Sequence, residues 1–157
     1  MAATLYKDFS TRLNIIYFAM IGSGLFFLIV SYFIKNQNGK FDVDDEFKRI
    51  LQIGLLVIII TLPQVSNFIY KKQLERAVAE KDLPAKLNSY FVANLIKFAL
   101  LEAPGLMSIA FYFITGDYLF LIGYILILVL FLINRPTDQK LIEHLQLTHQ
   151  EKADLGI

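Results

Sequence analysis

The chain has 157 residues, of which 56% are hydrophobic and 18% are charged, with 15 basic and 14 acidic side chains. Four apolar stretches (13–34, 50–70, 91–114 and 118–134) contain only two charges, and the other 27 lie between and around these stretches. This segregation excludes an ordinary soluble core, a disordered chain and, since cysteine is absent, a disulfide-stapled secreted domain.

The first three apolar stretches have 22, 21 and 24 residues. Each is long enough for a transmembrane helix, because roughly 20 apolar residues cross a hydrocarbon core of about 30 Å. The fourth has 17 residues and follows the third after only three residues. We therefore expect a hairpin whose short second helix is supported by its neighbour or by local thinning of the bilayer. The prediction is an all-α integral membrane protein: a single domain of four transmembrane helices, arranged as two antiparallel hairpins in contact with lipid.

The polar segments predict where the second helix begins and ends. An acidic run over 42–46 precedes it, and we expect Asp44 or Asp45 to cap it, since carboxylates are favourable at a helix N-terminus. Two of three charged pairs at i,i+4 over 71–81 are favourable, which predicts that the helix continues beyond the membrane. Leu83 and Pro84 predict its end, because the residue before proline avoids the helical conformation.

The tail, residues 135–157, is predicted to form a short amphipathic helix and a final turn. Pro136 suits the first turn of a helix, and Thr148 and Glu151 have the spacing of a capping box. Apolar residues recur on one side of the segment: Leu141, Ile142, Leu145 and Leu147. We expect a cap at the inner membrane surface; the alternative is a docking helix for a partner.

Basic residues predict the orientation of the chain. The N-terminal segment, the loop between the second and third stretches and the tail carry ten Lys and Arg residues, against four on the other side. By the positive-inside rule, both termini are expected to be cytoplasmic. The absence of an Asn-X-Ser/Thr sequon fits a bacterial protein, so we expect the bacterial cytoplasmic (inner) membrane.

A weak internal repeat relates the two hairpins. Shifting the chain by 80 residues aligns 10–34 with 90–114 without a gap, with eight identities in 25 positions. If the duplication is real, both copies have the same orientation, unlike the inverted repeats of many secondary transporters.

Glu102 is the sharpest candidate site, because it lies near the middle of the third stretch, where an ionised carboxylate is costly. Pro104 follows two residues later and is expected to disturb the helix and to free carbonyl groups nearby. Such a site suits the binding of a proton or a cation. The alternatives are a protonated Glu102 that hydrogen-bonds a neighbouring helix and a contact with a partner.

Lys97 lies five residues before Glu102, roughly 140° around the helix, which disfavours an ion pair within the helix. We expect Lys97 to extend to the lipid headgroups at the cytoplasmic end. The alternative is a pair with Glu102 of a second copy, which keeps Lys97 a candidate for ion or proton coupling.

Other polar side chains lie in the inner half of the spans: Asn14, Gln64, Asn67 and Asn94. They could line a vestibule that leads to Glu102, or make ordinary hydrogen bonds between helices. No motif indicates catalysis, a cofactor, a metal site or nucleic-acid binding, and His144 and His149 are five residues apart, which does not suit two ligands on one helical face. We therefore expect no enzymatic activity.

Two function classes remain open from the sequence. The first is a small accessory or scaffold subunit of a larger membrane assembly, with Glu102 joining helices. The second is an oligomeric proton- or cation-coupled transport or channel element that uses Glu102. The expected partners are the bilayer and either further copies of the chain or a larger membrane protein.

Overall fold

The computed structural model describes residues 2–38 and 43–157, and the regular structure in these ranges is helical. The helices are α1 (Ala2–Asn38), α2 (Asp45–Ala79), α3 (Leu83–Thr115), α4 (Leu119–Ile133), α5 (Asp138–Leu145) and α6 (His149–Leu155). Three of them, α1, α2 and α3, are long and apolar enough to cross a membrane, and a fourth span results if α4 and α5, bent by 72°, are taken together. The predicted all-α membrane architecture is confirmed.

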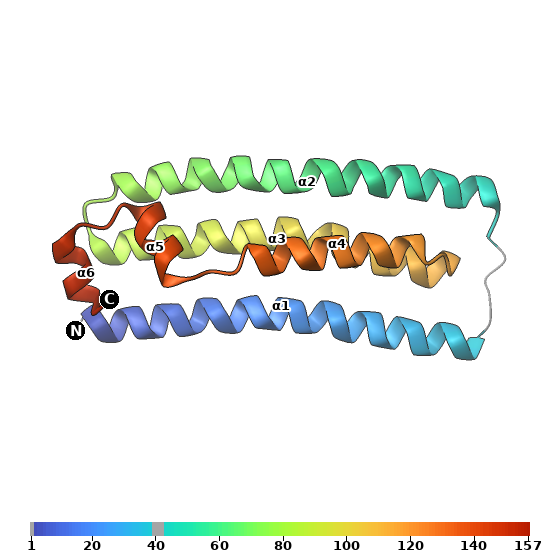
Figure 1. Ribbon diagram of the computed structural model, residues 1–157, viewed down its shortest axis with the longest axis horizontal. Coiled ribbons are helices and arrows are strands. Elements are labelled where there is room, and N and C mark those ends of the chain that lie inside the picture. The colour runs from blue at the N-terminus through green and yellow to red at the C-terminus, as the bar shows by residue number, and fades with distance from the viewer. Residues whose placement is uncertain (1, 39–42) are drawn as a thin grey trace.

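Helix α3 is the centre of the bundle. It lies between α1 and α2 and packs against α1, α2 and α4, while both termini lie at one end (Figure 1). Within the 18-residue apolar segment taken from each long helix, 44% of the residues of α3 are buried, against 17% of those of α1 and of α2. The first predicted hairpin is therefore open: α1 and α2 run antiparallel, but α3 separates them.

The outward faces of the long helices expose large apolar side chains. Phe26 of α1 and Phe68 of α2 are 68% and 69% exposed, and α4 exposes Ile125 and Leu132. Such a surface is unfavourable in water and suits the hydrocarbon of a bilayer. The main core lies toward the end with the termini, where the rings of Tyr17, Phe98 and Phe131 pack together in edge-to-face and tilted contacts.

The start of α2 partly follows the sequence prediction. Asp44 is at the N-cap position, but its side chain makes no capping hydrogen bond, and Asp45 and Glu46 lie in the first turn. Carboxylates there are favourable because of the helix dipole. Asp42, part of the same acidic run, lies outside the described residues.

The helix continues beyond the predicted span to Ala79, as expected. The role assigned to Leu83 and Pro84 was wrong, because they begin α3 instead of ending α2. Proline fits the first turn of a helix, where its missing N–H would have no partner in the helix.

The tail forms α5 and α6, and its start also differs from the prediction. Pro136 precedes α5 instead of lying in its first turn, because Thr137 is the N-cap and its side chain accepts a hydrogen bond from the Lys140 N–H. The predicted capping box of Thr148 and Glu151 is confirmed at the start of α6. Helix α5 packs against α2 and α3, and α6 packs against α1.

Helix α1 begins well before the predicted span, and its first turns hold the tail. The Tyr6 hydroxyl donates a hydrogen bond to the Asp138 carboxylate, and the Phe9 ring lies against Tyr90 of α3. The two ends of the chain are therefore joined at one end of the bundle.

The two hairpins of the proposed repeat differ in their second helices. Helices α1 and α3 run in the same direction, as a parallel repeat requires (Figure 1). Their partners have unequal lengths, since α2 has 35 residues and α4 has 15. The duplication therefore stays a prediction.

Candidate functional site

Glu102 faces α1 and forms a hydrogen-bonded pair with Ser23. The Ser23 Oγ lies 2.9 Å from Glu102 Oε1 and 2.8 Å from the carbonyl oxygen of Met20. A serine hydroxyl has one proton to donate, so it cannot donate to both acceptors. The Ser23 hydroxyl is therefore shared between a carbonyl of its own helix, on Met20, and the carboxylate of Glu102 on α3.

The pair lies at the seam between α1 and α3, where the bundle meets the lipid-facing surface. Ser23 is exposed and Glu102 is half-buried. Beside Glu102, a small hollow of about 20 Å³ lies between α1, α3 and α4, with room for about one water molecule. Glu102 therefore lines an internal hollow and also lies partly exposed at the surface of the bundle.

Two glycines allow α4 to approach α1 and α3 next to this seam. A Cβ atom on Gly24 would lie 2.9 Å from the Tyr124 hydroxyl, and one on Gly105 would lie 3.1 Å from Ile127 Cγ2. Side-chain atoms of Tyr124 also lie 3.5 Å from the Gly105 position. The Tyr124 side chain therefore packs closely against both glycine positions.

Pro104 lies inside α3 but does not interrupt it, since the helix continues to Thr115. Proline cannot donate to the carbonyl of Leu100, so one backbone acceptor loses its usual partner. The Pro104 carbonyl accepts a hydrogen bond of 2.7 Å from the Ser108 hydroxyl. The disturbance expected near Glu102 is therefore a lost backbone hydrogen bond within a continuous helix.

Lys97 faces away from Glu102. Its ammonium nitrogen lies 4.3 Å from the centre of the Tyr70 ring on α2, and the residue is only 9% exposed. The expected extension to lipid headgroups is corrected, because Lys97 packs on an aromatic face, where a cation is favourable. The two residues thus face different helices, as their spacing predicts.

His144 of α5 covers the same end of α2 and α3. Its Nδ1 lies 2.9 Å from the Tyr70 hydroxyl, and its ring packs against those of Tyr70 and Tyr90. Burial lowers the pKa of His144, and the nearby Lys97 lowers it further. Sequence reasoning missed this contact, although His144 lies next to Leu145 on the apolar side of the predicted tail helix.

The four polar candidates for a vestibule do not gather around one opening. Asn14, Gln64 and Asn94 each donate to the carbonyl four residues earlier in their own helix, at 2.9, 3.1 and 2.8 Å. Gln64 and Asn67 are exposed on α2, whereas Asn94 is buried. A shared lining that leads to Glu102 is therefore not visible in this arrangement.

Ser23 is the site residue that the sequence reasoning missed as a partner of Glu102. Counting from the start of each predicted span, Ser23 is the eleventh residue and Glu102 the twelfth. Because α1 and α3 run in the same direction, this count places the two side chains at the same depth. Depth matching between parallel spans would have identified the pair.

Within residues 2–38 and 43–157, no three His, Asp or Glu side chains gather as a metal site. Comparison with known proteins adds no relative: the chain matches no protein-family model, no curated protein and no solved structure.

Proposed function

We propose that the chain is an accessory or scaffold subunit of a larger membrane assembly. The observation that carries the proposal is the Ser23–Glu102 hydrogen bond at a lipid-facing seam, with Ser23 exposed. Polar groups in the hydrocarbon region are costly, and they stabilise contacts between helices when a partner covers them. A transmembrane helix of a partner protein, seated over the seam between α1 and α3, would cover this pair.

The surface around the pair supports close approach of such a helix. A Cβ atom added to Gly22 would meet no atom within 4 Å, so the backbone of α1 is open to a neighbour at this position. Small residues let transmembrane helices approach closely enough for backbone contacts. The proposal therefore places the partner against Gly22, Ser23 and the Glu102 side of α3.

The distribution of basic residues between the two ends of the bundle supports a location and an orientation for the subunit. Both termini and the packed tail lie at one end of the bundle (Figure 1), and the segments at that end carry most of the basic residues. We place this end in the cytoplasm and the chain in a bacterial cytoplasmic membrane. The tail would then offer a second contact for the partner.

The alternative is an oligomeric proton- or cation-coupled transport element. It is supported by the small hollow beside Glu102, whose volume matches about one water molecule. Several copies would be required, since a four-helix bundle encloses little pathway. No catalytic role is proposed.

Replacing Glu102 by Gln separates the two functions, because Gln keeps the size and hydrogen bonding of the side chain but does not titrate. The accessory role predicts that wild type and Glu102→Gln both purify in mild detergent with the same larger protein in fixed stoichiometry, as measured by native mass spectrometry. A self-oligomer in place of a larger partner, with an ion-dependent phenotype that Glu102→Gln abolishes, would refute it and support transport.

A further inference from the structure

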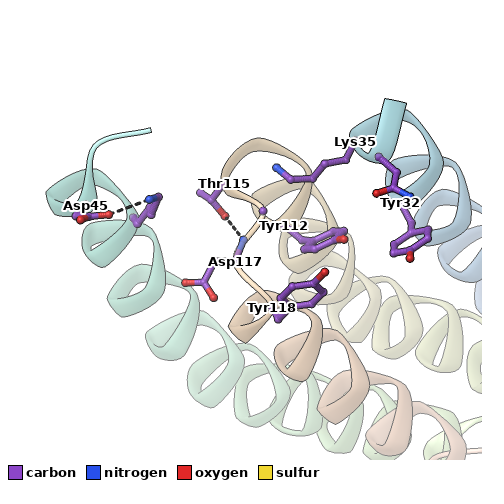
Figure 2. A pocket seen from close by; sticks show the side chains of 10 residues that line it. Tyr32, Lys35, Asp45, Tyr112, Thr115, Asp117 and Tyr118 are labelled. Carbon is purple, nitrogen blue, oxygen red and sulfur yellow. Dashed lines mark hydrogen bonds and ion pairs between the residues drawn. The ribbon is translucent and has the colours of Figure 1, made fainter. Parts of the chain in front are cut away.

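The end of the bundle opposite the termini contains a polar hollow of about 560 Å³ (Figure 2). It lies between the end of α1, the start of α2 and the turn between α3 and α4. Its lining includes two lysines, two aspartates and three tyrosines: Lys35, Lys48, Asp45, Asp117, Tyr32, Tyr112 and Tyr118. The hollow therefore presents both signs of charge beside aromatic rings.

The turn between α3 and α4 fixes one side of this hollow. Gly116 ends α3 in the left-handed conformation, with φ 72°, and a Cβ atom there would overlap Lys35 Cε. Lys35 crosses this glycine and donates to the Phe113 carbonyl at 3.1 Å. Figure 2 shows its side chain extending from α1 toward the turn that carries Thr115 and Asp117. On α2, Lys48 forms an ion pair with Asp45, with 2.8 Å between Nζ and Oδ1. The charged groups are thus placed by contacts within the fold.

An apolar groove of about 330 Å³ begins next to the hollow, between α2 and α4. On α2 its lining extends from Gln52 to Ile59, about 10 Å along the helix axis. Gly123 forms part of its wall, and the rim residues Leu56 and Ile122 are 59% and 53% exposed. The groove is therefore open to the lipid-facing surface.

One hydrogen bond marks the junction of the hollow and the groove. Gln52, which lines the groove, donates through Nε2 to Asp117, which lines the hollow, at 2.6 Å. The lining passes at this point from charged side chains at the end of the spans to hydrocarbon side chains within them. A phospholipid has the same order of groups, with a charged headgroup followed by an acyl chain.

We propose that the hollow and the groove together bind one zwitterionic phospholipid of the phosphatidylethanolamine type. The phosphate lies near Lys35 and Lys48, and the ammonium group lies near the carboxylates and the tyrosine ring faces, where a cation is favourable. One acyl chain occupies the groove. An anionic headgroup fits less well, because it supplies no cation for Asp117, which accepts hydrogen bonds from the neutral donors Gln52 and the Leu119 N–H.

The site is tested by native mass spectrometry of the purified chain in detergent, with phosphatidylethanolamine or phosphatidylglycerol of identical acyl chains added. We expect wild type to retain one phosphatidylethanolamine with at least about fivefold higher affinity than phosphatidylglycerol, a difference of about 1 kcal/mol. Equal retention of the two lipids, or no defined stoichiometry, would overturn the proposal.

Two matched pairs of variants locate the site. Ile122→Trp fills the groove, whereas Ile125→Trp adds the same ring on the same helix at an equally exposed position outside the groove. Lys48→Gln removes a cation from the hollow, whereas Arg49→Gln removes one from the next residue, which does not line it. We expect only the first member of each pair to weaken phosphatidylethanolamine binding, by about fivefold or more. Equal effects within either pair would place the lipid elsewhere.

Discussion

Ser23 of α1 and Glu102 of α3 form a hydrogen bond of 2.9 Å between two parallel helices at the lipid-facing seam. Hydrogen bonds between transmembrane helices contribute about 0.6 kcal/mol on average and up to about 1.7 kcal/mol. A double-mutant cycle with Ser23→Ala and Glu102→Leu should therefore give a coupling free energy of this size for unfolding in detergent. Thermal or denaturant unfolding followed by circular dichroism measures it.

Thr61→Val is the control for the loss of a hydroxyl group. The Thr61 hydroxyl donates to the Val57 carbonyl of its own helix on an exposed face, so its removal should not couple to Glu102. A cycle that shows no coupling between Ser23 and Glu102 would mean that the pair does not join α1 to α3.

The close packing of Tyr124 against Gly24 predicts an unequal response to two neighbouring glycine substitutions. Gly24→Ala places a methyl group 2.9 Å from the Tyr124 hydroxyl and should destabilise the fold by about 1–3 kcal/mol. Gly22→Ala meets no neighbour and should change stability by less than about 1 kcal/mol. Unfolding in detergent measures both effects.

Tyr124→Phe provides the rescue, because it removes the oxygen that the new methyl group would strike. The double variant Gly24→Ala, Tyr124→Phe should recover part of the stability lost by Gly24→Ala. Equal losses for Gly22→Ala and Gly24→Ala, without rescue, would contradict this packing.

His144 predicts that acid weakens the contact between α5 and the bundle. Burial lowers its pKa in the folded chain below the ordinary value of 6.5, so the unfolded chain binds more protons in the window below 6.5. The stability from neutral His144 is therefore complete above pH 6.5 and is lost as the pH falls toward the lowered value. Hydrogen exchange in α5 should increase between about pH 7.5 and pH 5.5, after correction for the intrinsic rate.

His144→Gln should remove this pH dependence, since Gln can form a hydrogen bond with the Tyr70 hydroxyl without titrating. His149→Gln, at an exposed position in α6, should leave it unchanged. If both variants respond to acid as wild type does, His144 is not the group that titrates.

The ion pair between Lys86 and Glu151 predicts a second acid response, at lower pH. Lys86 Nζ lies 2.6 Å from Glu151 Oε1, and the two side chains are 12% and 18% exposed, respectively. The hydrogen bond from Lys86, followed by that from the Thr148 N–H, lowers the pKa of Glu151 below its ordinary value of 4.5. The stability from this pair is thus present above pH 4.5 and is lost as the pH falls through the lowered value.

Glu151→Gln should increase hydrogen exchange in α6 at pH 7 by an amount equivalent to about 1 kcal/mol. Glu143→Gln, which removes a carboxylate from an exposed position of α5, serves as the control. Equal protection of α6 in Glu151→Gln and wild type would show that the pair does not hold the tail.

Much of the fold could be predicted from the sequence, because charge segregation and span length are direct consequences of the bilayer. The limits of α4, the continuation of α2 and the capping box of α6 follow from local residues. The central position of α3 was not predicted, although the third stretch contains the two charged side chains of the spans, and charges within a span favour the interior of a bundle. Close contacts at Gly24, Gly105 and Gly123 place α4 against the other three long helices, and they depend on packing that the composition of a span does not reveal.

The candidate site was predicted in part. Glu102 is evident as a charge within a span, and the direction of Lys97 away from it follows from helical spacing. The partners of both residues were not found, because Ser23 and Tyr70 belong to other helices and are ordinary residues within their own spans. Which side chain meets Glu102 or Lys97 depends on the depth and the rotation of the packed helices, and a single sequence specifies both only indirectly.

The most direct test of the accessory role is site-specific photocrosslinking at the seam between α1 and α3 in native membranes. A photoreactive residue at Ala99, which is exposed one turn before Glu102, is compared with one at Ile60, which is exposed on α2. We predict an adduct of one defined mass with a larger membrane protein at Ala99 and none at Ile60. Adducts between copies of the chain, or with lipid alone, at Ala99 would contradict the account.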